Sequence, residues 1–175
     1  MLFSKQLAVI SSVAIQFKAH AFDFKENDNQ SIQSIVGGEE IERGSRPYLV
    51  ALGNGNSSYW GQRCGGSLIS PNAVMTAAHC LFGGTKRNPV WDPPEWIELN
   101  RHDLLDDDGV IRLYLEDSTQ CEGDAVYHPG FDPLTTDNDV AILFLPEPIS
   151  NLTTVTLNTD PNVPIDDAPL DISGW

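Results

Sequence analysis

Residues 64–80, CGGSLISPNAVMTAAHC, carry the strongest signal for the fold in this sequence. Two short apolar runs, 67–70 and 73–76, stand on either side of a proline and an asparagine, which is the pattern of two strands joined by a turn. The stretch ends with His79 directly before Cys80. A histidine placed in this way can be a general base, a metal ligand or a buried structural residue, and the stretch alone leaves all three open.

Short strands are also predicted on both sides of this stretch. Residues 48–52 form an apolar run, residues 110–116 alternate between apolar and polar side chains, and residues 140–145, VAILFL, are continuously apolar. The continuous run predicts a strand that is buried on both faces. Turn-forming residues separate these runs at 53–56, 88–94, 106–109 and 128–138. Because no long segment has helical periodicity, the sequence predicts an all-β barrel or sandwich.

The composition limits the classes of function. The chain has 175 residues, of which 41% are hydrophobic and 20% charged, so we expect a globular domain or a large portion of a bigger protein. The formal net charge is −15. Binding to nucleic acid or to an anionic membrane requires clustered cations, so neither is expected as a partner.

The first residues have the features of a secretory signal peptide. Lys5 precedes a short apolar core at 7–15, and Ala19-His20-Ala21 has the small-residue pattern of a cleavage site. The apolar core is too short to span a bilayer. We therefore expect residues 1–21 to be a signal peptide, residues 22–34 to be a propeptide, and the product to be secreted and extracellular.

Secretion bears on the cysteines and on two asparagines. The chain has three cysteines, Cys64, Cys80 and Cys121. If two of them form a disulfide, as is common in secreted proteins, the third has a partner elsewhere or is a reactive thiol. The tripeptides that begin at Asn56 and Asn151 match the N-glycosylation sequon, which predicts candidate glycosylation sites.

Several motifs need one common explanation. A zinc site at His79 and Cys80 does not fit, because adjacent residues rarely reach one tetrahedral metal and no second cluster follows. The motifs, in chain order, are IVGG at 35–38, CGGSLI at 64–69, TAAHC at 76–80, HPGF at 128–131, DNDVAIL at 137–143 and ISGW at 172–175. Together they resemble the chymotrypsin/trypsin-like serine endopeptidases from residue 35 to residue 175. The resemblance implies an incomplete peptidase domain over 35–175: an antiparallel β-barrel of the trypsin-like type, the N-terminal barrel only of a two-barrel fold.

The resemblance assigns a role to each member of a catalytic pair. By this resemblance His79 is the general base and Asp139 is the carboxylate that orients it, while Asp137, two residues earlier, is the less favoured partner. Histidine suits this task because its pKa, about 6.5 in model peptides, lets it take and return a proton near neutral pH. A buried carboxylate fixes the imidazole tautomer and stabilises the imidazolium.

Three further features follow from the resemblance. Cys64 and Cys80 match the family disulfide that closes the histidine loop, which leaves Cys121 without a partner. Ile35 is expected to become the new N-terminus after activation, although Ser34 before it is not the basic residue of tryptic activation. Some relatives bind calcium in the loop that corresponds to 100–116, and the aspartates there offer oxygen ligands, but Arg101 stands where a carboxylate is expected. Those aspartates are Asp103, Asp106, Asp107 and Asp108. We expect neither a metal nor another cofactor.

The sequence contains no serine in a nucleophile context. Ser67 lies in a predicted strand, Ser173 stands near the end, and no Gly-Asp-Ser-Gly-Gly segment occurs. The sequence therefore predicts a secreted trypsin-like endopeptidase, acting on protein or peptide substrates by acyl transfer, whose nucleophile-bearing C-terminal half is missing from this chain; an activating protease is a further expected partner. The chain alone is predicted to be inactive. The alternative is a non-catalytic secreted single-barrel homologue that acts as a binding module.

Overall fold

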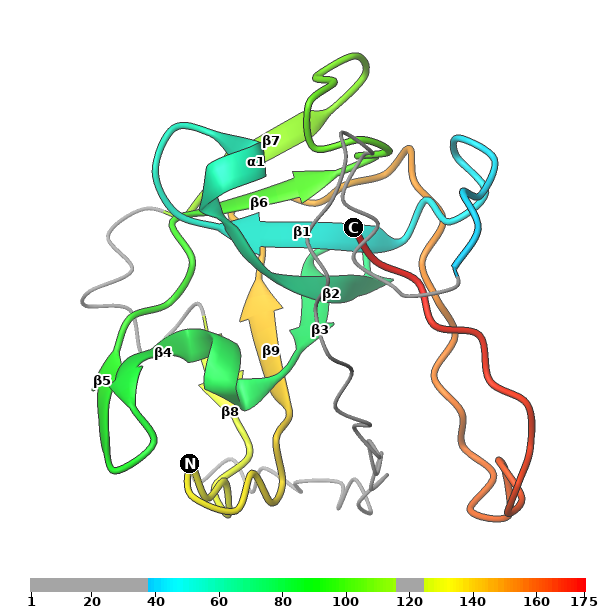
Figure 1. The fold of residues 1–175 in the computed structure, drawn as a ribbon. Helices are drawn as coiled ribbons and strands as arrows, with labels where there is room; N and C mark the ends of the chain where they lie inside the picture. The colour runs from blue at the N-terminus through cyan, green and yellow to red at the C-terminus, as the bar shows by residue number, and fades with distance from the viewer. Residues whose placement is uncertain (1–37, 116–124) are drawn as a thin grey trace, which may run out of the picture. The chain divides into compact units, whose positions relative to one another are not determined.

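The computed structural model describes residues 38–115 and 125–175, shown in colour in Figure 1. These residues belong to one compact unit that runs from Ile32 to Trp175. The predicted signal peptide, the propeptide, Ile35 and Cys121 lie outside the described residues. Within the described residues, no helix has the length and apolar character that crossing a membrane would require.

The regular secondary structure of the described residues is almost entirely β. The larger sheet has seven antiparallel strands in the order β7-β6-β1-β2-β3-β9-β8, and β4 with β5 forms a separate hairpin (Figure 1). Within residues 38–115 and 125–175, helical structure is confined to one α-helical turn, α1 (Ser58–Gly61), and one 3₁₀ turn, η1 (Ala78–Leu81). The strands are β1 (Leu49–Gly53), β2 (Gln62–Ser70), β3 (Ala73–Thr76), β4 (Phe82–Thr85), β5 (Asn88–Trp91), β6 (Trp96–Leu99), β7 (Ile111–Tyr114), β8 (Ala125–Tyr127) and β9 (Ala141–Phe144).

The 64–80 stretch contains two paired strands joined by a turn, as predicted, and these strands lie in the middle of the larger sheet. β2 pairs with β1 on one side and with β3 on the other, and β3 in turn pairs with β9. Gly66 lies where these strands approach most closely, because a Cβ atom built on it would stand 2.8 Å from a Val74 side-chain carbon and 2.9 Å from the Met75 carbonyl oxygen. A side chain at position 66 would therefore push β2 away from β3.

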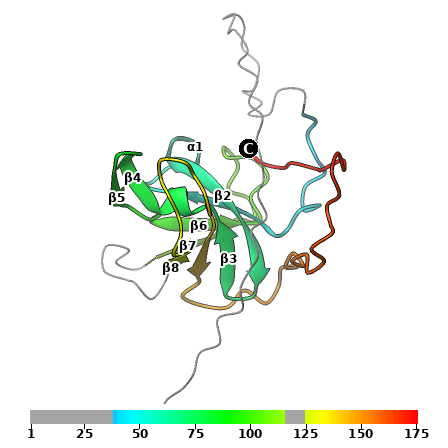
Figure 2. The ribbon, with the colours of Figure 1, turned by 90° about the horizontal axis from the view of Figure 1, so that it is seen from below.

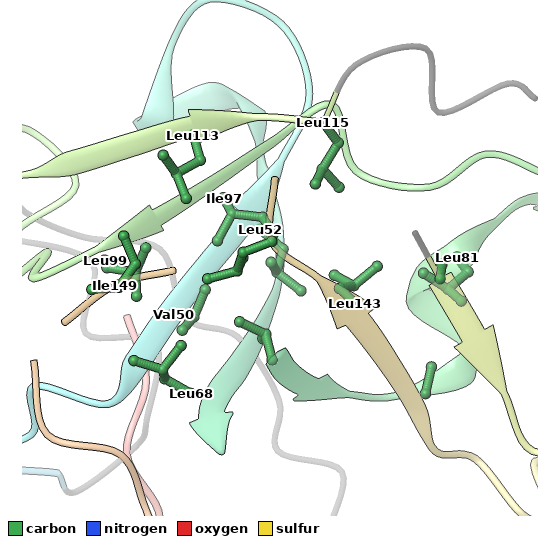
Figure 3. Close-up of a cluster of buried hydrophobic side chains, with 14 of the residues drawn as sticks. Val50, Leu52, Leu68, Leu81, Ile97, Leu99, Leu113, Leu115, Leu143 and Ile149 are labelled. Carbon is green, nitrogen blue, oxygen red and sulfur yellow. The ribbon is translucent and has the colours of Figure 1, made fainter. Parts of the chain in front are cut away.

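One face of the curled sheet encloses the apolar core (Figures 2 and 3). Val50, Leu52, Leu68, Leu99 and Leu143 are fully buried there and come from strands β1, β2, β6 and β9. In an antiparallel sheet of this kind alternate side chains face the core, so a few residues from each strand suffice to fill it. An all-β partial barrel built on this core confirms the predicted fold class.

The strand over 140–145 differs from the prediction in one respect. Ala141 and Leu143 are buried, but Phe144 is 39% exposed, so β9 is buried on one face only. β9 lies between β3 and β8 in an antiparallel sheet, and such sheets commonly cover one face only. A continuous apolar run was therefore the wrong basis for predicting burial on both sides.

Several strands gave no clear signal in the sequence. The predicted turn at 88–94 contains β5, which pairs with β4 as a two-stranded hairpin, and β6 and β8 were not predicted at all. Pro89 cannot donate a backbone hydrogen bond, which is tolerated because β5 has a partner on one side only. β6 includes the fully buried Glu98, which interrupts an apolar pattern. Both features hide a strand from pattern reading.

Candidate active site

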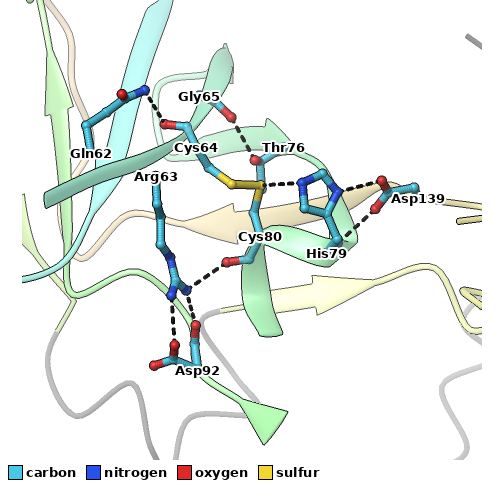
Figure 4. Close-up of a disulfide and its surroundings, with 9 residues drawn as sticks. All are labelled: Gln62, Arg63, Cys64, Gly65, Thr76, His79, Cys80, Asp92 and Asp139. Atoms are coloured by element: carbon cyan, nitrogen blue, oxygen red, sulfur yellow. Dashed lines mark hydrogen bonds and ion pairs between the residues drawn. A yellow bond between two sulfur atoms is a disulfide. The ribbon is translucent and has the colours of Figure 1, made fainter. Parts of the chain in front are cut away.

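Strand pairing brings His79 and Asp139 together although they are far apart in the sequence. β3 and β9 are antiparallel, with Thr76 opposite Ala141. His79 follows the end of β3 in the turn η1, and Asp139 precedes the start of β9. The end of one strand and the start of its antiparallel neighbour lie side by side, so the two side chains meet at this edge of the sheet (Figure 4).

Two hydrogen bonds join the residues (Figure 4). The Nδ1 atom of His79 lies 2.7 Å from Oδ2 of Asp139, and the backbone N–H of His79 donates to Oδ1 at 2.8 Å. A carboxylate at Nδ1 favours the tautomer that carries its proton on Nδ1, which leaves Nε2 free to accept a proton. The arrangement is that of an imidazole oriented for general-base chemistry.

The pair is open to solvent. The His79 side chain is 59% exposed and that of Asp139 is 21% exposed, so the carboxylate is only partly buried rather than fully buried as expected. On the other side of the ring, Nε2 lies 3.6 Å from Sγ of Cys80. Among the described residues no hydroxyl group bonds to His79. The end of the imidazole that would take a proton is therefore accessible.

The other candidate partners lie elsewhere. Asp137 is exposed and forms an isolated bridge with Asp132 in the loop before β9, while Asp139 faces the histidine. Ser67 lies within β2, paired with Leu49 and Met75, which fits a structural position. Ser173 lies in the irregular C-terminal segment.

Cys64 and Cys80 form the predicted disulfide, which ties β2 to the histidine turn (Figure 4). The zinc hypothesis is excluded for these sulfur atoms on a second ground as well. Cys64, His79 and Cys80 are a group of side chains in the described residues whose ligand atoms lie close enough to share a metal ion, but the two sulfurs are bonded to each other. A disulfide has no thiolate to offer a metal.

Sequence reasoning missed Arg63, which also holds this turn. Its Nη2 atom donates to the Cys80 carbonyl oxygen at 2.9 Å, and its Nη1 atom donates to Oδ2 of Asp92 at 2.8 Å (Figure 4). The residue after His79 is thus fixed to β2 by a charged hydrogen bond in addition to the disulfide. The position of Arg63 directly before Cys64 gave no such signal.

The loop that corresponds to the calcium loop of some relatives is organised around Arg101. The guanidinium is 1% exposed and donates to Oε2 of Glu98 at 2.8 Å, to the Asp103 carbonyl at 3.1 Å and to the Asp106 carbonyl at 2.8 Å. It also donates to Oδ1 of Asp107 at 2.6 Å. These carboxylate and carbonyl oxygens are the ligand types that Ca²⁺ requires.

The residues present therefore do not fit a bound calcium ion. A divalent ion at the centre of these oxygens would meet the buried positive charge of Arg101, and like charges repel strongly away from water. Ser58 and Arg112 complete the cluster: the Ser58 hydroxyl donates to Glu98 at 2.8 Å, and both arginines donate to that hydroxyl. Every buried polar side-chain atom in the described residues has a partner.

Asp106 shows how the surface of this loop is stabilised. Its carboxylate accepts the backbone N–H of Asp108 at 3.0 Å and pairs with Arg43. The hydrogen bond from Asp108 and then that from Arg43 favour the charged form, so the pKa of Asp106 lies below its usual value of 3.8.

The geometry can now be set beside known proteins. A family model described as Trypsin matches residues 35–175. The chain belongs to the trypsin family. Trypsin-family relatives include a trypsin from Simulium vittatum, 37% identical over 66% of this chain and 40% of that protein. Chymotrypsin-C from Rattus norvegicus is 31% identical over 81% of this chain and 49% of that protein.

A solved trypsin-like structure has a similar fold. The VesB protease of Vibrio cholerae superimposes with a TM-score of 0.55 at 26% identity, covering 71% of this chain and 34% of that one. The chain spans less than half the length of the trypsin and chymotrypsin-C relatives it matches. These trypsin-family relatives carry the names of serine endopeptidases, which supports the same class of chemistry at the level of the family.

Proposed function

We propose that this chain is the base-bearing half of a secreted serine endopeptidase that hydrolyses peptide bonds in proteins or peptides. The observation that carries the proposal is the 2.7 Å contact between Nδ1 of His79 and Oδ2 of Asp139 in a trypsin-family fold. In this role Nε2 of His79 takes the proton of a serine hydroxyl as that oxygen attacks the scissile carbonyl. The same imidazolium then returns the proton to the leaving amine.

Asp139 acts on the histidine and not on the substrate. Its Oδ2 atom holds the proton on Nδ1, and its Oδ1 atom accepts the backbone N–H of His79, so the ring cannot rotate away easily. The negative charge stabilises the imidazolium that forms during attack. The serine and the donors that bind the developing oxyanion come, in this proposal, from a segment beyond the matched residues.

The test is a comparison between this chain and its continuation. We would sequence the transcript beyond the Trp175 codon and express both the 175-residue chain and any longer product. A longer product that reacts with a fluorophosphonate probe and hydrolyses peptides, with both lost in His79→Ala, supports the proposal. Stoichiometric labelling of the 175-residue chain, or full activity of the His79→Ala variant, contradicts it.

The second candidate is a binding module without catalysis. Large apolar side chains are exposed along the C-terminal segment, including Ile165 at 72%, Leu170 at 67% and Ile172 at 69%. Exposed apolar surface of this kind is typical of a face that contacts another polypeptide. A transcript with an authentic stop after Trp175, together with a stable secreted product that no serine probe labels, would favour this function.

Secretion and maturation are part of the same proposal. Asn56 and Asn151 are both exposed in the structure, which is compatible with glycosylation. We propose cleavage before Ile35, by an activating protease that does not require a basic residue there. N-terminal sequencing of the secreted product tests this, and a chain that begins at another residue contradicts it.

A further inference from the structure

A group of aromatic rings lies beside the His79–Asp139 pair and has no role in the proposed chemistry. Phe82 is at its centre: its ring centroid lies 5.4 Å from that of Trp91, 5.3 Å from that of Tyr127 and 5.8 Å from that of Phe131. The ring centroid of Tyr127 also lies 6.1 Å from that of Trp91 and 6.4 Å from that of Phe131. We call Phe82, Trp91, Tyr127 and Phe131 the aromatic bridge.

The aromatic bridge joins the two segments that carry the pair. Phe82 begins β4 directly after η1, the turn that contains His79, and it pairs with Trp91 across the β4–β5 hairpin. Tyr127 ends β8 and pairs with Ala141, near the start of β9. Phe131 stands in the loop that leads from β8 to Asp139. One half of the bridge therefore belongs to the histidine segment and the other half to the aspartate segment.

The exposed pair needs such support. A solvent-exposed pair contributes little to stability, so the His79–Asp139 contact adds little to the strand pairing that brings its two segments together. Phe82, Trp91 and Phe131 are packed against the main core, which gives the bridge a rigid base. Aromatic pairs at these separations attract each other beyond the effect of the area they bury.

We propose that the aromatic bridge, with Phe82 at its centre, positions the His79 and Asp139 segments relative to each other and so keeps the proton on Nδ1. The proposal rests on the proposed function for its catalytic meaning. Phe82 is a positioning residue, because it acts through the histidine turn and touches no reacting atom. The inference makes a prediction about the histidine tautomer that does not require activity.

The main experiment measures imidazole ¹⁵N chemical shifts of His79 in the labelled chain above neutral pH. We expect the Nδ1–H tautomer in the unaltered chain, a mixture with the Nε2–H tautomer in Phe82→Ala, and the original tautomer in Phe82→Tyr, which keeps the ring. Val90→Ala is the matched control, because Val90 lies on the same hairpin, is 54% exposed and is not part of the bridge. His102, which pairs with Glu40 and lies outside the segments of the bridge, serves as an internal reference in every spectrum.

Phe82→Leu is a second variant for the case in which Phe82→Ala does not fold, since leucine removes the ring but keeps most of the apolar volume. A folded Phe82→Leu or Phe82→Ala chain that retains the tautomer of the unaltered chain overturns the proposal. In a longer, active product, we expect Phe82→Leu to lower kcat by about 10- to 100-fold with little change in KM. If that product is active without His79, the proposed function fails, whereas the tautomer result still reports on the bridge.

Discussion

Two of the acid–base side-chain pairs in the described residues, His79–Asp139 and Arg101–Glu98, differ in what is left unpaired. At one end of the sheet His79 meets Asp139, with the histidine 59% exposed and Nε2 free of any strong partner among the described residues. In the other arrangement Arg101 meets Glu98, with side chains that are 1% and 0% exposed. The His79–Asp139 pair is accessible to solvent, and the Arg101–Glu98 pair is buried.

The difference shows what makes a polar pair suitable for chemistry. The donors of Arg101 are all directed at protein oxygens, so the cluster can only hold the loop together. The His79 ring is held on its Nδ1 side and remains open on the other, so it can exchange a proton. A reactive site thus relies on neighbouring structure for its geometry, whereas a buried network supplies its own.

The largest expected effect tests the solvent-accessible His79–Asp139 pair. In a longer, active product, Asp139→Asn should lower kcat by about 10⁴-fold, because the amide favours the wrong imidazole tautomer. Thermal unfolding of the same variant should change little, since a half-exposed pair contributes at most about 1 kcal/mol. Steady-state kinetics and melting curves check both parts. Asp137→Asn is the matched control, and equal losses in the two variants would contradict the assignment of Asp139.

The next largest effect tests the buried Arg101–Glu98 pair. Arg101→Ala should reduce the free energy of unfolding by about 3–5 kcal/mol, because it removes a buried charge from beside Glu98. Arg43→Ala, which removes an exposed side chain that pairs with Asp106 of the same loop, should change it far less. Denaturant unfolding measures both variants. The melting temperature of the unaltered chain should not respond to millimolar Ca²⁺ or to EDTA, and a clear rise with Ca²⁺ would show that the loop binds the ion after all.

A third prediction concerns the Cys64–Cys80 disulfide, which lies beside the His79–Asp139 pair. The double variant Cys64→Ala/Cys80→Ala should lose about 3 kcal/mol of stability, the value expected in the chain-entropy model for a link across 16 residues. Because Arg63 and strand pairing also hold the turn, the His79 tautomer should persist in the folded fraction. Loss of the tautomer with the fold intact would mean that the disulfide, and not the surrounding packing, sets the geometry.

The smallest expected effect concerns Asp106, on the surface of the loop around Arg101. The pKa of Asp106 is lower in the folded state than the usual 3.8, so its charged form favours folding. This contribution is present above the unfolded pKa and is lost as the pH falls through the lower folded value. Asp106→Asn should therefore flatten the dependence of stability on pH below about pH 4. Unfolding curves at several pH values check this, with Asp166→Asn, at an exposed aspartate, as control; equal slopes in the two variants would contradict it.

Much of the fold could be predicted because its signals are local. The apolar runs at 67–70 and 73–76 became parts of β2 and β3, and the alternation at 110–116 became β7 with Leu113 buried. The strands without such signals, β5 and β6, contain Pro89 and Glu98, whose places are acceptable only because of an unpaired edge and a buried arginine. Those compensations come from distant residues and leave no mark on the local pattern.

The candidate site divides in the same way. The family motifs, the histidine with its cysteine, and the two aspartates that could serve it can all be read from the sequence. The family resemblance assigned Asp139 to His79, and the structure shows their contact. That Arg101 fills the loop where calcium was considered, and that Phe82 contacts Tyr127 and Phe131, is visible only in the tertiary structure. The physical reason is that each of these contacts joins residues brought together by strand pairing or by packing, and a residue's own neighbours in the chain carry no record of that pairing.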